Sequence, residues 1–218
     1  MKKVLQILFF SITLISTHSS ILSQMKVVNL VAKMNGVFRD ESENLIPYWG
    51  YGLFEPGGPY KSEFPAPLLE FNQDDSVTIH FFNDSHEAHT IHLHGLDVDQ
   101  LNDGVGHTSF DIFSGDTYDY KFKATHPGSF LYHCHVNSTF HVALGMYGMI
   151  SVNATDSLYL FNGGPGYNKK YHFLASDMYK YWNLNTSSPG PFHLYDPDYF
   201  MINGKSGIQL FDDSSTII

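Results

Sequence analysis

Two short motifs, HTIHLHG and YHCH, constrain this 218-residue chain more than any other feature. They bring together the following metal-binding side chains: His89, His92, His94, His133, Cys134 and His135. Cys134 is the only cysteine, so an internal disulfide is impossible and the thiol is inert, nucleophilic or a metal ligand. The chain has 13 histidines against 12 lysines and arginines, and this enrichment in histidine favours metal binding.

The alternation of side chains along a β-strand divides these residues into two groups. The two histidines of HLH share one face, with His89 on the other, and the two histidines of HCH share one face, with Cys134 on the other. We therefore expect two metal sites, back to back. The first site comprises His89, Cys134, His141 and Met146. The second site comprises His92, His94, His133 and His135.

The first predicted site has the ligands of a blue-copper centre: two imidazoles, one thiolate and a weak axial methionine. Zinc prefers four strong ligands and gains little from a thioether. The order Cys134, His141, Met146 within one short segment suits a copper site formed by a single loop. The second group, four imidazoles without a thiolate, suits a copper cluster that binds and reduces oxygen. Because Cys134 is covalently joined to His133 and His135, a short bonded path would connect the two sites.

The segment from Met25 to about Ala154 has the pattern of an all-β domain. In SVTIHFFN (76–83), Val77, Ile79 and Phe81 alternate with polar residues, and further strands are expected at 117–124, 128–135 and 145–154. Turn-forming residues separate these segments, and none shows sustained helical periodicity. The pattern predicts a β-sandwich or a barrel.

Residues 1–24 resemble a secretory signal peptide. Two lysines precede an apolar run, 4–15, that is too short to cross a hydrocarbon core of ~30 Å, which argues against the alternative of a membrane anchor. We therefore expect a secreted or periplasmic protein. The net charge of -10 argues against nucleic acid or an anionic membrane surface as a partner.

Three further parts follow the signal peptide in the predicted organisation. The domain with the metal ligands spans 25–155, and NGGPGYNKK marks a linker at 156–169. Residues 170–218 contain two more predicted strands but are too few for a second sandwich. They are expected to be the incomplete beginning of a second domain.

The motifs resemble those of the multicopper oxidases. HLHGL, followed by NDGVGHTSFDIFSGDTYDYKF, is similar to the first-domain signature of laccase-type enzymes, and YHCHVNSTFHVALGM is similar to their cysteine motif. KYHFLASDMY and FMINGKSG resemble the opening of the next domain in the same family. The resemblance implies a cupredoxin-like Greek-key β-sandwich, followed by the start of a second cupredoxin domain.

The resemblance also implies a role for each ligand. Type 1 copper would be bound by His89, Cys134 and His141, with Met146 as the axial ligand. Type 2 copper would be bound by His92, and the type 3 pair by His94, His133 and His135. Asp103 matches the acid that relays protons to oxygen in the family, although an ordinary turn aspartate in NDG is the alternative.

The chain departs from ordinary laccases in several respects. Three-domain laccases bind type 1 copper in the last domain, whereas a full set of ligands occurs in the first domain here. This resembles the two-domain subgroup, which forms homotrimers with clusters shared between neighbouring subunits. The spacing from Cys134 to His141 is closer to that of copper nitrite reductases, and Asn137 stands where many relatives have an acid. The cluster needs imidazoles from two domains, and this domain supplies half of them.

The leading prediction is an oxidoreductase that takes single electrons from a phenol, an aromatic amine or a metal ion and reduces O2 to water. A copper nitrite reductase is one alternative, but it has no use for His92 and His135 as ligands. A non-catalytic electron-transfer cupredoxin is another, and it leaves the four outward imidazoles unexplained. Among the remaining histidines, His107 is the one for which the motif leaves a functional role open.

Overall fold

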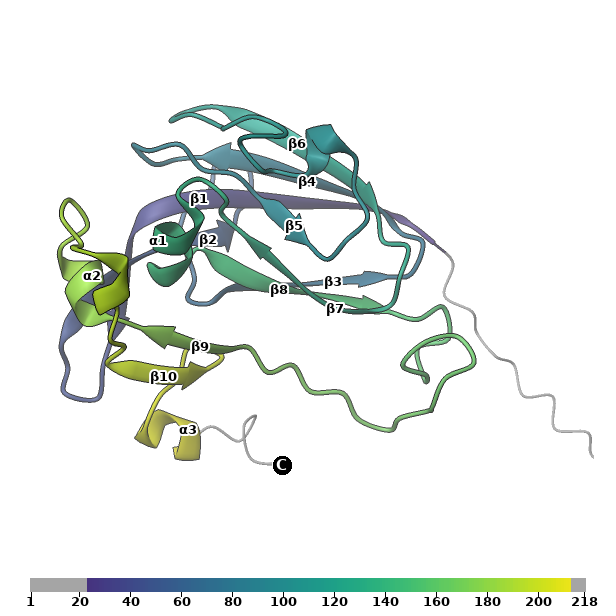
Figure 1. The fold of residues 1–218 in the computed structure, drawn as a ribbon. Coiled ribbons are helices and arrows are strands. Elements are labelled where there is room, and N and C mark those ends of the chain that lie inside the picture. The colour runs from purple at the N-terminus through teal and green to yellow at the C-terminus, as the bar shows by residue number, and fades with distance from the viewer. Residues whose placement is uncertain (1–22, 213–218) are drawn as a thin grey trace, which may run out of the picture.

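The computed structural model describes residues 23–212, and within them the strands form two four-stranded sheets and a small two-stranded sheet. The two larger sheets face each other as a sandwich, and the C-terminal segment lies against one end of it (Figure 1). Most of the predicted signal peptide, residues 1–22, lies outside the described residues. No helix within residues 23–212 is long and apolar enough to cross a membrane.

The first large sheet has the strand order β2-β1-β4-β6. Its strands are β1 (Met25–Arg39), β2 (Leu45–Leu53), β4 (Ser76–Asn83) and β6 (Thr117–Lys123). β1 runs parallel to β4, whereas the other pairs are antiparallel. In β4, Val77, Ile79 and Phe81 are buried, whereas the residues between them are partly exposed. This confirms the strand predicted at 76–83 and the face that it turns towards the core.

The second large sheet, of order β3-β8-β7-β5, contains the two histidine motifs. Its strands are β3 (Ala66–Asn72), β5 (His92–His94), β7 (Gly128–His133) and β8 (Tyr147–Asn153). β5 lies at the edge and pairs antiparallel with β7, so that His92 is directly opposite His133. The predicted strand at 128–135 was too long, since β7 ends at His133 and Cys134 begins the following loop.

One hydrophobic cluster between the sheets forms the core, and it includes Cys134 and Met146. Three fully buried tyrosines carry hydroxyl groups into this core. The hydroxyls of Tyr51 and Tyr132 donate hydrogen bonds to backbone carbonyls, and the hydroxyl of Tyr120 accepts one from a backbone N–H. Each of these three hydroxyls therefore has a hydrogen-bond partner, and the burial of each ring contributes ~1.5–3 kcal/mol to stability.

Short helices connect or follow the strands. They are η1 (Gln100–Asn102), α1 (Ser138–Ala143), α2 (Lys180–Leu184), η2 (Phe192–Leu194) and α3 (Ile208–Asp212). The sequence shows no sustained helical periodicity, so it did not reveal the short helix α1, which contains His141. A helix of six residues is too short to produce a recognisable period of 3.6.

The C-terminal segment packs against the sandwich. Its sheet consists of β9 (Ala175–Met178) and β10 (Tyr199–Ile202). Met178 and Met201 join a second buried cluster with residues of β1 and β2, and the side chain of Asn183 donates a hydrogen bond of 2.9 Å to the carbonyl of Pro47. The ring of Trp182 packs on Phe140 of α1. The predicted linker at 156–169 and second domain at 170–218 remain predictions.

Candidate metal centre

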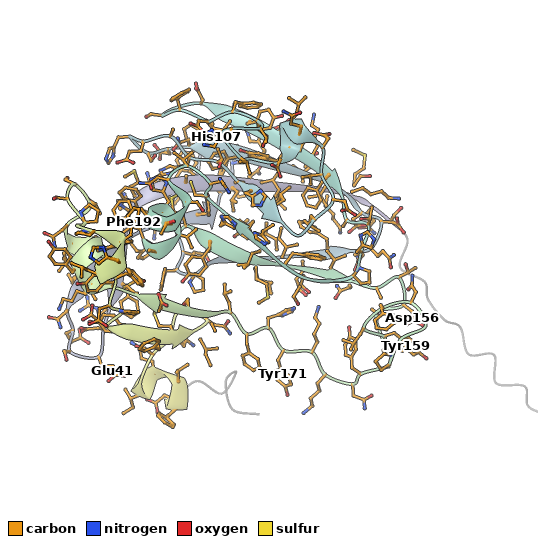
Figure 2. All side chains as sticks on the ribbon, viewed as in Figure 1. Glu41, His107, Asp156, Tyr159, Tyr171 and Phe192 are labelled. Carbon is orange, nitrogen blue, oxygen red and sulfur yellow. The ribbon has the colours of Figure 1, made fainter. Side chains whose placement is uncertain are left out.

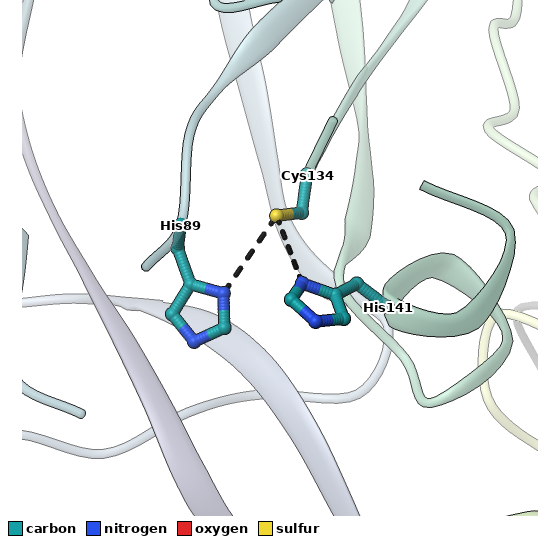
Figure 3. Close-up of side chains that lie close together, drawn as sticks. All are labelled: His89, Cys134 and His141. Atoms are coloured by element: carbon teal, nitrogen blue, oxygen red, sulfur yellow. Dashed lines mark hydrogen bonds between the residues drawn. The ribbon is translucent and has the colours of Figure 1, made fainter. Parts of the chain in front are cut away.

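Three side chains from separate parts of the chain meet in the core. His89 and Cys134 are fully buried and His141 is 2% exposed. The Sγ atom of Cys134 lies 3.3 Å from Nδ1 of His141 and 3.7 Å from Nδ1 of His89 (Figure 3). All three donor atoms lie within 4.8 Å of one another. The structure thus brings together three of the four residues predicted for the first site, with both imidazoles turned towards the thiol.

The backbone fixes each of these residues. His89 forms an isolated β-bridge with Ile112, with N–H to O distances of 3.0 and 3.2 Å. Cys134 follows β7 directly, and its N–H donates to the carbonyl of Met146 at 3.1 Å. The N–H of Met146 in turn donates to the carbonyl of His141, also at 3.1 Å. The three ligands of the predicted Cys–His–Met loop are therefore linked by backbone hydrogen bonds.

Met146, the predicted axial ligand, is fully buried in the same core cluster as Cys134. Trp49 packs edge-on against the rings of His89 and His141, with centroid separations of 6.1 and 5.1 Å. This apolar surrounding keeps water away from the donor atoms and holds the imidazoles in place. Trp49 could not be predicted from the sequence, because it belongs to β2 and is remote from both motifs.

Burial shifts the protonation of all three groups. It lowers the pKa of His89 to about 3, an effect to which the charges of His141 and His86 add, and it lowers the pKa of His141 to about 4. It raises the pKa of the Cys134 thiol to about 11. At neutral pH the protein therefore presents two neutral imidazoles and one protonated thiol, which a metal cation can bind after the thiol loses its proton.

The donor set fits copper. The buried Nε2 of His89 has no hydrogen-bond partner within residues 23–212. No hydrogen bond at this nitrogen therefore prevents the ring from turning Nδ1 towards a metal ion. Two imidazoles and one thiolate with a methionine nearby in the core are the ligands of a blue-copper centre. A buried, preformed group of this kind also has little need to rearrange when the metal binds.

The second group lies on the outer face of the same sheet. Ring centroids of His92 lie 5.4 Å from His94 and 5.1 Å from His133, and the donor atoms of these three residues lie within 4.8 Å of one another. Nδ1 of His94 is 3.3 Å from Nε2 of His133. In contrast to the buried group, His94 is exposed and the other two are half-buried. The alternation of faces predicted from the sequence is therefore present in the structure.

The fourth residue of the predicted second site, His135, lies beside this group with its ring close to that of His92, although the compact set of donor atoms comprises the other three residues. Its ring lies 5.3 Å from that of His92 and 5.9 Å from that of His133, centroid to centroid. Its backbone N–H donates to Oγ1 of Thr90 at 3.1 Å, which ties the two motifs together. Thr90 was not singled out from the sequence, although it stands between the ligands of the first motif.

Asp103 contacts the second group. Its carbonyl oxygen lies 2.7 Å from Nδ1 of His92, and its carboxylate oxygen Oδ1 lies 3.4 Å from the same nitrogen. The hydroxyl of Thr108 donates to the other carboxylate oxygen at 3.0 Å. Gly104 follows with a φ of +68°, and a Cβ there would lie 2.0 Å from the carbonyl of Ile91. Glycine at this position therefore permits the turn that brings Asp103 to His92.

The outer histidines border an open cleft of about 710 Å³. His94 and His133 line one side, and residues of the C-terminal segment, among them Trp182 and Tyr195, line another. Phe192, which also lines the cleft, lies beside α2 (Figure 2). His107, in contrast, lies on an exposed turn at the upper edge of the molecule. His107 thus belongs to neither group of ligands.

Comparison with known proteins agrees with this geometry. Residues 58–157 match the family model described as multicopper oxidase. Over this stretch the chain is similar to multicopper oxidase domains. The matched region contains both histidine motifs and the whole loop from Cys134 to Met146.

Solved structures and curated proteins show the same relationship. A blue copper oxidase from Nitrosomonas europaea is 27% identical, with a TM-score of 0.62 over 84% of this chain and 54% of that one. The copper-containing nitrite reductase of Neisseria meningitidis is 26% identical over 68% of this chain and 38% of its own length. Laccase 1 of Metarhizium majus is 28% identical over 67% of this chain and 26% of its own length. The all-β cupredoxin-like fold is confirmed, and the chain spans well under half the length of these curated relatives.

Proposed function

We propose that this protein is a copper-dependent oxidoreductase of the laccase type, which takes single electrons from a reducing donor and delivers them to O2. The observation that carries the proposal is the pair of histidine groups on opposite faces of one sheet, connected through Cys134. The buried group suits electron uptake, because its donors are shielded from water and from exogenous ligands. The open group suits the binding of a small molecule such as O2, because its imidazoles border a cleft.

In this proposal, His89, Cys134 and His141 hold type 1 copper, with Met146 as the axial ligand. Copper at such a site supplies one-electron redox chemistry with a thiolate ligand. Cys134 loses its proton on metal binding, and the backbone hydrogen bonds to Met146 hold the loop closed around it. The peptide bonds from Cys134 to His133 and His135 give the shortest covalent connection between the two faces of the sheet.

The outer group is proposed as half of a trinuclear copper site. His92 would serve the type 2 position, and His94, His133 and His135 the type 3 pair. The remaining imidazoles are proposed to come from a second domain, shared within a homotrimer, and the open cleft beside His94 and His133 supports this arrangement. Asp103 is proposed to move protons through its Oδ1 atom, which lies 3.4 Å from Nδ1 of His92. We further propose that the protein is secreted or periplasmic.

A copper nitrite reductase is the second candidate. The similarity to the Neisseria enzyme and the long Cys134–His141 spacing favour it. The compact outer group of His92, His94 and His133 favours the oxidase, because a reductase of this kind needs only one imidazole before its cysteine.

Copper loading and turnover separate these candidates. The copper-loaded full-length protein, with the proposed second domain, is expected to show the intense visible absorption of a thiolate–copper bond and to consume O2 in the presence of a phenol or an aromatic amine. Consumption of nitrite without O2 uptake would favour the reductase. Visible absorption without consumption of either would favour an electron-transfer protein.

A further inference from the structure

The carboxylate of Glu87 faces the outward nitrogen of a buried ligand. Because Nδ1 of His141 is turned towards Cys134, Nε2 is the nitrogen that points away from the donor group (Figure 3). Oε2 of Glu87 lies 3.6 Å from this Nε2. The His141 side chain is 2% exposed and that of Glu87 is 46% exposed. The pair therefore connects the buried group to the surface, with a negative charge at the outer end.

The loop that presents Glu87 is held by a buried side chain. Nδ2 of Asn83, which is fully buried, donates to the carbonyl oxygens of Glu87 and Ile112 at 2.7 and 2.8 Å. The hydroxyl of Ser85 donates to Oδ1 of Asn83 at 2.7 Å. The backbone at Glu87 is thus fixed to the same residue, Ile112, that forms the β-bridge with His89.

Within the part of the chain that the structure describes, no lysine or arginine neutralises the charge of Glu87. The neighbouring carboxylate of Asp84 forms an ion pair with Lys33 at 2.6 Å. Among residues 23–212, Glu87 has no ion pair with lysine or arginine, and its one charge contact is with His141. A separation of 3.6 Å is too long for a good hydrogen bond, and His141 is neutral at pH 7, so Glu87 acts on the centre as a nearby negative charge and not as an ion-pair partner.

We propose that Glu87 is a positioning and specificity-determining residue, which makes the His89–Cys134–His141 centre easier to oxidise and favours cationic electron donors over anionic ones. This inference rests on the proposed copper function of that centre. A fixed negative charge stabilises the more positive, oxidised form, and so lowers the reduction potential. The same charge raises the local concentration of cations at the surface where donors approach His141.

The test uses the copper-loaded full chain and compares Glu87→Gln with Glu55→Gln, a matched change at an exposed carboxylate after β2. A redox titration of the visible band gives the reduction potential. Stopped-flow bleaching of the same band gives the rates with hexaammineruthenium(II), a cationic donor, and with ferrocyanide, an anionic donor. Each donor gives up one electron, and Cu(II) is reduced to Cu(I).

We expect Glu87→Gln to raise the reduction potential by an amount equivalent to about a tenfold change in the redox equilibrium, or about 59 mV for one electron. The ratio of the rate with the cation to the rate with the anion should fall about threefold or more. Glu87→Asp should restore most of both values, and Glu55→Gln should change neither.

The outcomes separate the two proposals. If Glu87→Gln matches Glu55→Gln in potential and in rate ratio while the visible band is present, the role of Glu87 is overturned and the copper site stands. If the unmodified chain binds copper without developing the band, the proposed copper site and the role of Glu87 are both overturned.

Discussion

The ring of Trp182, in the C-terminal segment, packs against that of Phe140 with their centroids 5.5 Å apart. Phe140 precedes His141 in α1, so the segment after the sandwich supports the helix that contributes His141 to the buried group. Trp182 also packs against Phe192 and Tyr195, at 5.2 and 4.8 Å. The geometry of the buried centre therefore depends on residues outside the two histidine motifs.

Trp182→Ala should test this dependence. Removal of a tryptophan that is 2% exposed should lower the free energy of unfolding by ~3–5 kcal/mol, as measured by urea denaturation. Because α1 loses its packing partner, the visible spectrum of the copper-loaded protein should also change. The neighbouring Tyr181 is 48% exposed, and Tyr181→Ala should have little effect on either quantity. Equal stability losses in the two variants would contradict the supporting role of Trp182.

Cys134→Ser should abolish the visible absorption of the copper-loaded protein. A hydroxyl group is a poorer, harder ligand than a thiolate, and it lacks the sulfur on which the absorption depends. Absorption spectroscopy and copper stoichiometry measure the effect. Loss of the band with the fold intact by circular dichroism is the expected outcome, whereas an unchanged band would mean that Cys134 is not a ligand.

His135→Ala should separate the two faces of the sheet. We expect the visible band to remain, because His135 lies outside the buried group, and O2 uptake by the full-length protein to be lost. His107→Ala, at an exposed turn away from both groups, is the matched control and should retain the band and the uptake. Full O2 uptake by His135→Ala would refute the assignment of the outer site.

Asp40 should make the stability of the fold sensitive to acid. Its carboxylate accepts hydrogen bonds from the side chains of Asn44 and Tyr199 and from the N–H groups of Ser42 and Asn44. These bonds, that from the Asn44 side chain above all, lower its pKa to about 2. Since the folded pKa lies below the unfolded value of about 4, the contribution is complete above pH 4 and is lost as the pH falls towards 2.

Asp40→Asn should therefore destabilise the protein at neutral pH and flatten the dependence of stability on pH between about 4 and 2. Urea unfolding at a series of pH values measures this, with Asp196→Asn at an exposed carboxylate as the control. Since Tyr199 belongs to β10, the variant also tests whether the C-terminal segment is held to the β1–β2 turn. If the stability of Asp40→Asn still falls as steeply between about pH 4 and 2 as that of the unmodified protein, the hydrogen bonds to Asp40 contribute little.

Sequence periodicity predicted the parts of the site that depend on strand geometry. His92 and His133 are paired in β5 and β7 and share the outer face, as the alternation along a strand predicts, whereas His89 and Cys134 lie just outside these strands and are nevertheless buried on the other side. Glu87 and Trp182 could not be predicted in this way. Their roles depend on contacts between segments that are distant in the sequence, and neither residue belongs to a motif that signals metal chemistry.

The length of helix α1 and the position of His135 could not be predicted from the sequence either. β7 ends at His133, so Cys134 and His135 lie in the loop that follows, beyond the strand to which the predicted alternation applies. Such a boundary depends on the pairing of β7 with β8, rather than on local preference.

The packing of Trp182 on α1 has a consequence for the order of events at the ribosome. Every residue of the proposed buried centre, from His89 to Met146, is synthesised before Trp182 is. At about 5–20 residues per second, the stretch from Phe140 to Trp182 takes about 2–8 seconds to make. During that interval the apolar side of α1 is uncovered in the nascent chain. A chaperone that binds exposed apolar helices, or a copper ion, could therefore bind near α1 before Trp182 packs against Phe140.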